Sequence, residues 1–237
     1  MAEQEKEKKE KPAKQPKQQG EKGEKKAKKQ KGPAPAEQAA APEEPQQPAP
    51  PPRLFERYKK EIAPALQQKF GYKNLLAVPR LEKIVISMGL GKAVTAGEKG
   101  KMEQAEKELG VIVGQRPVRC KAKKSVANFK VREGMETGLK VTLRGARMYE
   151  FLDRLIATAI PRVKDFRGLD PNAFDKAGNY NFGFTEQTVF PEVNAAEITF
   201  QQGMNITMVT TGAKPDQGRE LLRLFGFPFR DTSKQER

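Results

Sequence analysis

A strand followed by an amphipathic helix in residues 140–168 constrains the fold more than any other feature of this chain. In the strand, Lys140, Thr142 and Arg144 point to one face, while a valine and a leucine point to the other, because successive strand side chains alternate. One face of this unit can therefore build a core. The other face offers cations and a hydroxyl group to solvent, which is the polarity of an RNA-binding surface.

The helix of this unit has a single apolar stripe, and its polar residues fall on the opposite side. Pro161 is expected to end it, because proline lacks the backbone N–H that the helix needs. The stripe consists of Met148, Phe151, Leu152, Leu155, Ile156, Ala159 and Ile160.

Composition indicates a polyanionic partner. The chain has 45 Lys and Arg against 30 Asp and Glu, with a pI near 9.8, which favours nucleic acid or an anionic membrane. A membrane partner is not expected, since no apolar run reaches the roughly 18 residues of a membrane-spanning helix. The absence of histidine excludes a His-based catalytic site, and with one cysteine it excludes a structural zinc site. We expect no enzyme activity, cofactor or metal.

Three regions are predicted along the chain. Residues 1–52 hold 12 of the lysines and 9 of the glutamates but no Leu, Ile, Val, Phe or Tyr, so they are expected to form a disordered extension. It serves either as a solubility tail or as an accessory RNA-binding arm. Residues 53–230 keep a net charge of +12 and are predicted to form one domain, followed by a polar tail at 231–237.

The domain is predicted to be α+β, with an antiparallel or mixed sheet, helices packed on one face and an open basic face on the other. The other predicted elements are a helix at 53–70 ended by Gly71, a strand at 81–88, a helix at 99–109 ended by Gly110, strands at 118–121, 181–190 and 205–211, and a last helix capped by Asp216.

Three candidate strands carry polar residues on one side. Besides the strand at 140–144, Lys83 shares a side with Ser87, and Arg119 shares a side with Lys121. In one sheet they would form a surface that neutralises phosphates and hydrogen-bonds sugars or bases. An ordinary solvated face has a similar composition. Cys120 is expected to be a buried thiol on the opposite side, with Val118.

The segment from Lys121 to Gly134 is a long basic loop with one aromatic residue. Such a loop suits a contact with an RNA backbone, although a solvated loop is the alternative. Phe129 could stack on RNA or anchor the loop to its own domain. The candidate contact residues are Lys123, Lys124, Ser125, Asn128, Phe129, Lys130 and Arg132.

Two features that suggest catalysis do not support it. The run from Met88 to Ala93 follows a strand and contains two glycines, but it lacks the glycine spacing and the Ser or Thr of a phosphate-binding loop. Asp165, Asp170 and Asp175 lie beside proline or glycine in predicted turns, where carboxylates usually cap the backbone.

Several motifs together resemble the bacterial large-subunit ribosomal protein number five. They occur in order from about Leu54 to Arg230 and leave residues 1–52 outside the resemblance. The motifs are PRLEKIVISMGLG at 79–91, GQRPVRCKAKKSVANFKVREG at 114–134, KVTLRGARMYEFLDRL at 140–155, PRVKDFRGL at 161–169 and FGFPFR at 225–230.

The resemblance implies a cytoplasmic protein of the large ribosomal subunit that binds 5S rRNA in the central protuberance. It also implies contacts with 23S rRNA, the P-site tRNA, neighbouring 5S-binding proteins and small-subunit protein number thirteen at an intersubunit bridge. Gln115 and Thr142 match RNA-facing positions of that family, whereas Ser87 stands where the family has asparagine. The basic loop matches the segment that approaches P-site tRNA. The competing classes are a free RNA chaperone and, more distantly, a phosphotransfer enzyme.

Overall fold

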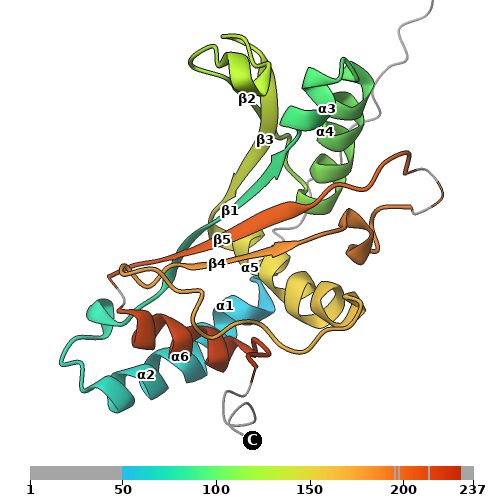
Figure 1. Cartoon of the computed structure of the whole chain (residues 1–237). Coiled ribbons are helices and arrows are strands. Elements are labelled where there is room, and N and C mark those ends of the chain that lie inside the picture. Colours follow the sequence, from blue (N-terminus) through green and yellow to red (C-terminus); the bar gives the residue numbers. More distant parts are fainter. Residues whose placement is uncertain (1–49, 195, 197, 213, 231–237) are drawn as a thin grey trace, which may run out of the picture. The chain divides into compact units, whose positions relative to one another are not determined.

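Five antiparallel strands form the central sheet, in the order β2-β3-β1-β5-β4 (Figure 1). The computed structural model describes residues 50–194, 196, 198–212 and 214–230, so almost all of the predicted extension and the whole C-terminal tail lie outside it. The strands are β1 (Leu81–Gly89), β2 (Val118–Lys121), β3 (Glu136–Leu143), β4 (Tyr180–Phe184) and β5 (Met204–Thr210). The predicted α+β class is confirmed, and all strand pairs are antiparallel.

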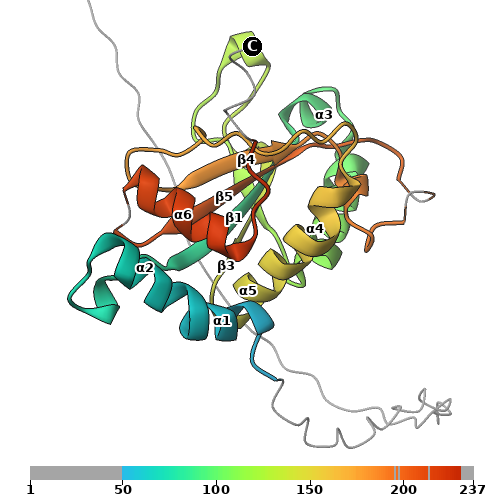
Figure 2. The same cartoon turned by 90° about the horizontal axis from the view of Figure 1, so that it is seen from below.

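Helices pack on one face of the sheet (Figure 2). The chain enters through α1 (Arg53–Arg57), the π-helical turn η1 (Tyr58–Ile62) and α2 (Ala63–Phe70), which ends at Gly71 in the left-handed conformation as predicted. The remaining α-helices are α3 (Gly91–Thr95), α4 (Lys99–Val113), α5 (Gly145–Arg154) and α6 (Pro215–Phe225). Among the described residues, no helix is long and apolar enough to cross a membrane.

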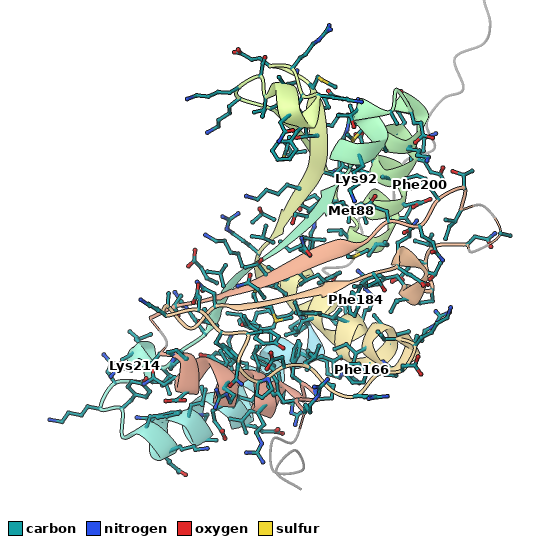
Figure 3. All side chains as sticks on the ribbon, viewed as in Figure 1. Met88, Lys92, Phe166, Phe184, Phe200 and Lys214 are labelled. Carbon is teal, nitrogen blue, oxygen red and sulfur yellow. The ribbon has the colours of Figure 1, made fainter. Side chains whose placement is uncertain are left out.

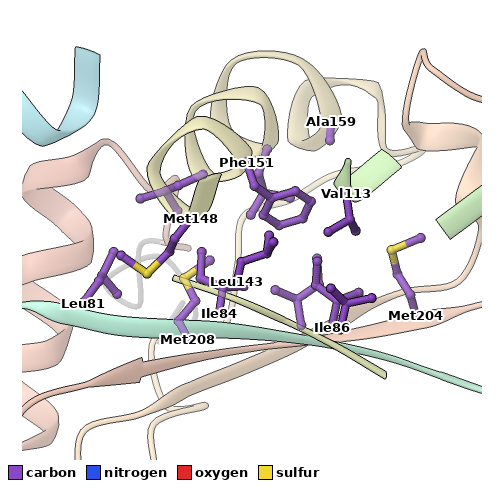
Figure 4. Close-up of a cluster of buried hydrophobic side chains, with 14 of the residues drawn as sticks. Leu81, Ile84, Ile86, Val113, Leu143, Met148, Phe151, Ala159, Met204 and Met208 are labelled. Carbon is purple, nitrogen blue, oxygen red and sulfur yellow. The ribbon is translucent and has the colours of Figure 1, made fainter. Parts of the chain in front are cut away.

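The apolar stripe predicted from the sequence is the centre of the core. Met148, Phe151 and Ala159 lie against the sheet beside Ile84 and Ile86 (Figure 4), and each of these side chains is at most 1% exposed. Burying a large apolar side chain stabilises the fold by roughly 1.5–3 kcal/mol. The helix leaves regular α geometry after α5, through a π-helical turn at Leu155–Ala159 and a 3-10 turn at Ile160–Arg162.

An aromatic cluster joins the N-terminal and C-terminal helices. Tyr58 stacks on Phe225 of α6 at 6.1 Å between ring centroids, and Tyr149 of α5 lies 6.3 Å from the same ring. Burial raises the pKa of Tyr149 to about 12, so its hydroxyl stays neutral in the core.

Three predicted element boundaries are wrong. The helix expected to end at Gly110 continues to Val113 and ends at Gly114, because buried Ile112 and Val113 extend its apolar stripe beyond Gly110. The strand expected at 181–190 ends at Phe184. There the chain turns back around the fully buried Gln187, whose amide donates to the backbone carbonyl of Phe200 at 2.8 Å.

The last helix is not capped by Asp216, whose side chain is exposed in the first turn of α6. The helix begins after Lys214 with a proline in its first turn. Instead, the Gln217 side chain turns back and accepts a hydrogen bond from the Lys214 backbone N–H at 3.0 Å. A polar residue later in the first turn therefore performs the capping that the sequence suggested for the aspartate.

A close backbone contact at the β1–β3 pair gives a stability prediction. A Cβ added at Gly138 would lie 2.7 Å from the carbonyl oxygen of Met88, whereas one added at its pairing partner Gly89 would meet nothing within 4 Å. Gly138→Ala should lower the free energy of unfolding by about 1–3 kcal/mol, because two backbones must separate. Gly89→Ala is the matched control and should change it by less than about 0.5 kcal/mol. Chemical denaturation of both variants measures the difference, and equal midpoints would contradict the contact.

Candidate nucleic-acid interface

The sheet face away from the helices carries two rows of side chains that cross several strands. In the first row, Ser87 of β1 pairs with Lys140 of β3 on one side and with Asn205 of β5 on the other. Paired residues point to the same side of a sheet, so these three side chains share one face. We call this surface the open face.

The second row of the open face lies one step along the strands. Val85 of β1 pairs with Thr142 of β3 and Thr207 of β5, and Thr207 pairs in turn with Asn181 of β4. The residues between the two rows, such as Ile86, are buried against the helices. The open face therefore presents hydroxyl, amide and ammonium groups above an apolar core.

A shallow hollow lies on the open face where β1, β4 and β5 meet. Asn205 covers one side of it, since a Cβ added at Gly183 would lie 2.9 Å from the Asn205 side-chain oxygen. The glycine thus leaves space for the asparagine amide beside the exposed backbone of β4. The hollow is lined by Ser87, Asn181, Phe182, Asn205, Ile206 and Thr207.

The predicted positions at the margins of this face are less uniform. Lys83 is half-buried and forms an ion pair with Glu82 at 3.3 Å. Arg144 is exposed but lies one residue beyond β3, where it is the residue before α5. Gln115 is half-buried directly after Gly114, at the sheet edge and before β2 begins. These residues border the two rows rather than belong to them.

The predicted facing of β2 is wrong. Arg119 pairs with Leu139, which is 1% exposed in the core, so its side chain lies on the helix side of the sheet. Lys121 lines a hollow on that same side together with Arg119 and Met102 of α4. Val118 pairs with Lys140 and is 66% exposed on the open face.

Cys120 is not the buried thiol that was expected, because its side chain is only half-buried. It pairs with Gly138 and follows Val118 on the open side of β2. The strand at the sheet edge therefore has its apolar residues on the open side and its arginine towards the helices, the reverse of the prediction.

Residues 122–135 form a hairpin that extends β2 and β3 beyond the end of the sheet, and we call it the basic arm (Figures 1 and 3). The Ala122 N–H donates to the Met135 carbonyl at 2.8 Å, and Val126 and Val131 exchange two backbone hydrogen bonds. Near the tip, Ser125 accepts a hydrogen bond from the Glu133 N–H at 2.9 Å. The predicted loop is thus an ordered hairpin whose Ser125 oxygen helps to hold it.

The cations of the basic arm are available to a ligand. Lys123, Lys124, Lys130 and Arg132 are exposed, and none has a carboxylate of the described residues within ion-pair distance. Lys130 adopts the left-handed conformation with φ 53°, which turns the chain after the 3-10 turn Ala127–Phe129.

Phe129 does not anchor the basic arm to the domain. Its side chain is 70% exposed at the tip, next to the exposed Asn128. Of the two roles left open by the sequence, the structure keeps the one in which the ring is presented to a partner.

The features that superficially suggested catalysis have structural roles. Gly91 begins the short helix α3 rather than a phosphate loop. The Asp175 carboxylate accepts hydrogen bonds from the backbone N–H groups of Ala177 and Asn179, and from the Asn179 side chain, which lower its pKa. Within residues 50–194, 196, 198–212 and 214–230, no group of three potential metal ligands is present.

Sequence reasoning missed Asn181, Asn205 and Thr207 as members of the interface. Their strands were expected, and the alternation of β5 was visible, with Asn205 and Thr207 opposite Ile206 and Met208. The missing information was the strand order, which places β5 directly beside β1. Without that order, polar residues late in the chain could not be joined to Ser87 and Thr142.

Comparison with known proteins agrees with this geometry. Residues 136–229 match the C-terminus of the ribosomal L5 family, and residues 74–132 match Ribosomal protein L5. The chain is 55% identical over 177 residues to the large ribosomal subunit protein uL5 of Alkaliphilus metalliredigens, covering 75% of this chain and 98% of that protein. The chain belongs to the ribosomal protein L5 family.

Other L5 relatives give the same result. The large ribosomal subunit proteins uL5 of Thermosipho africanus and Moorella thermoacetica are each 55% identical to the chain, over 177 and 179 residues, and the alignments cover 97% and 98% of those proteins. The two L5 family matches together include the open face and the basic arm. L5 is a structural ribosomal protein and not an enzyme, which confirms the prediction of a non-enzymatic chain.

Proposed function

We propose that the chain binds 5S rRNA through its open face and so helps to attach this RNA to the large ribosomal subunit. The observation that carries the proposal is the pair of cross-strand rows, with Lys140, Ser87 and Asn205 in one and Thr142 and Thr207 in the other. Short polar side chains on a sheet can reach 2′-hydroxyl groups and base edges, and lysines neutralise phosphates.

The basic arm is proposed to contact the P-site tRNA. Four exposed cations and an exposed aromatic ring suit a contact that follows an RNA backbone and stacks on a base. The arm and the open face belong to the same β3 strand and its extension. A single rigid strand can thus connect the 5S rRNA contact to the tRNA contact.

Further partners are proposed from the family resemblance. These are 23S rRNA, the neighbouring 5S-binding proteins and small-subunit protein number thirteen at an intersubunit bridge. For Ser87, the proposed RNA contact is either direct or bridged by water, since serine is shorter than the asparagine of the family. Gln115, Lys83 and Arg144 border the open face and are proposed as secondary contacts.

Two measurements test the proposal. The chain should sediment with intact large subunits, and the purified protein should bind 5S rRNA with an affinity that falls steeply with salt, by roughly 0.7–0.9 logarithmic units per logarithmic unit of salt for each phosphate contacted. A free RNA chaperone would instead remain in the soluble fraction while ribosomes are intact. That outcome would overturn the assignment to the subunit.

Phe129 gives a separate prediction for the basic arm. Phe129→Ala should change the free energy of unfolding by less than about 0.5 kcal/mol, because the ring is mostly exposed. Stacking on a base contributes about 1–3 kcal/mol, so the same variant should weaken the tRNA contact. Phe129→Tyr keeps a stacking ring and serves as the control. Footprinting of P-site tRNA on ribosomes that carry each variant measures the effect, and identical footprints for alanine and phenylalanine would exclude stacking.

A further inference from the structure

Arg119 lies between two carboxylates where the basic arm leaves the sheet. Its Nε donates to Oε2 of Glu106 at 2.7 Å, and its Nη1 donates to Oε2 of Glu136 at 3.0 Å. A further nitrogen, Nη2, lies 2.5 Å from the same Glu106 oxygen. The guanidinium thus connects α4 to β3 across the base of the arm, on the side away from the open face.

The α4 end of this connection is firmly held. Glu106 follows the buried Ala105, and Met102 and Leu109 of the same helix are also buried in the core. The Glu106 side chain is 13% exposed. The hydrogen bond from Arg119 is the main cause that lowers the pKa of Glu106, with a smaller contribution from Arg116, so the carboxylate stays ionised at neutral pH.

The strand ladder is interrupted at the same place. Cys120 pairs with Gly138, but the next residue, Lys121, pairs with Glu136, so Thr137 is left between two pairs. Such a bulge bends a two-stranded ribbon and increases its twist. The backbone ladder therefore leaves the direction of the arm weakly determined at this point.

Beyond the bulge, the basic arm is held by bonds within itself. Across the part of the chain that the structure describes, the hydrogen bonds of residues 123–134 join them to one another or to Ala122 and Met135. A two-stranded hairpin without further packing is only marginally stable in one orientation. A connection at its base must then determine where the tip lies.

We infer that Arg119 is a positioning residue that sets the direction of the basic arm by bridging Glu106 and Glu136, and that it is not an RNA ligand. Its guanidinium already has two carboxylate partners and faces the helices. The purpose of the bridge rests on the proposed function, because an arm that reaches tRNA must be aimed while the open face holds 5S rRNA.

The direction of the arm can be measured without RNA. Two spin labels are placed on a Cys120→Ser background, one after Asn128→Cys at the tip and one after Arg223→Cys on the exposed side of α6. In the background chain, pulsed electron spin resonance should give one narrow distance distribution. Arg119→Ala should broaden it about twofold, because the arm then behaves as an unbraced ribbon.

Two further variants identify the interaction. Arg119→Lys can bond only one carboxylate at a time and should give an intermediate width. Arg116→Ala is the matched control, because Arg116 contacts the same Glu106 at 3.2 Å but is 87% exposed and precedes β2, and its distribution should stay narrow. If Arg119→Ala does not fold, Glu106→Gln removes the charge at the helix end of the bridge and should also broaden the distribution.

The outcomes separate this inference from the proposed function. A distribution in Arg119→Ala as narrow as in the background chain would overturn the positioning role. Weaker 5S rRNA binding by Arg119→Ala with unchanged distances would overturn it too and would make Arg119 an RNA ligand. A broadened distribution in a chain that fails to bind 5S rRNA even without substitution would support the bridge and reject the proposed function.

Discussion

A chain that carries both Thr142→Ala and Asn205→Ala is expected to bind 5S rRNA about 30- to 100-fold more weakly than the unsubstituted chain. Each substitution removes one hydrogen-bonding group from a different row of the open face. A hydrogen bond contributes about 1–1.5 kcal/mol net, and 1.4 kcal/mol corresponds to a tenfold change in Kd. Because both side chains stand above the buried core rather than in it, the free energy of unfolding should change little.

Filter binding at a fixed salt concentration measures this loss. Thr158→Ala is the matched control, since Thr158 is also partly exposed but belongs to the helical segment η4 on the other side of the sheet. Adding Gln115→Ala to the double variant tests whether the sheet edge takes part. If the double variant and the control bind equally, the open face is not the 5S rRNA site.

The facing of the central strands could be predicted because the information is local. In β1 and β3, isoleucine, valine and leucine alternate with polar residues, so the period of two identifies both the strand and its buried side. The same holds for the stripe of α5, whose residues are buried as expected. Where one face is strongly apolar, the hydrophobic effect alone selects the orientation.

The facing of β2 could not be predicted for a related reason. The sequence VRCK alternates, but neither of its faces is strongly apolar, so the pattern does not decide which side is buried. The register with β3 and the attraction of Arg119 to Glu106 decide it instead. Both are tertiary facts that involve residues distant along the chain, and the sequence pattern alone contains neither.

The candidate interface was therefore only partly predictable. Ser87, Lys140 and Thr142 could be named because their own strands specify them, and the family resemblance added Gln115. Asn205 became part of the same surface only when the order β2-β3-β1-β5-β4 placed its strand beside β1. Strand order depends on packing between distant segments, which alternation within one strand cannot reveal.

Reversal of two charges on the basic arm, in the variant Lys123→Glu with Lys124→Glu, should separate the two proposed RNA contacts. Both lysines are exposed and lack a described carboxylate partner, so the change should leave the fold intact. Contact with the P-site tRNA should weaken on the order of tenfold, because two cations near phosphates become repulsive anions. Binding of 5S rRNA at the open face should stay nearly unchanged. The dissociation rate of P-site tRNA from ribosomes that carry the variant measures the first effect, and filter binding measures the second.

Lys59→Glu with Lys60→Glu is the matched control, because it reverses another adjacent pair of exposed lysines, in the helical turn η1 on the other side of the sheet. This control should release tRNA at the unsubstituted rate. Loss of 5S rRNA binding in the arm variant would contradict the division, since it would place 5S rRNA on the arm. Because the arm leaves the sheet as a continuation of β3, the Arg119→Ala variant should reproduce the tRNA effect in weaker form while all arm cations remain present. Agreement between the two variants would show that both the charge of the arm and its direction determine the contact.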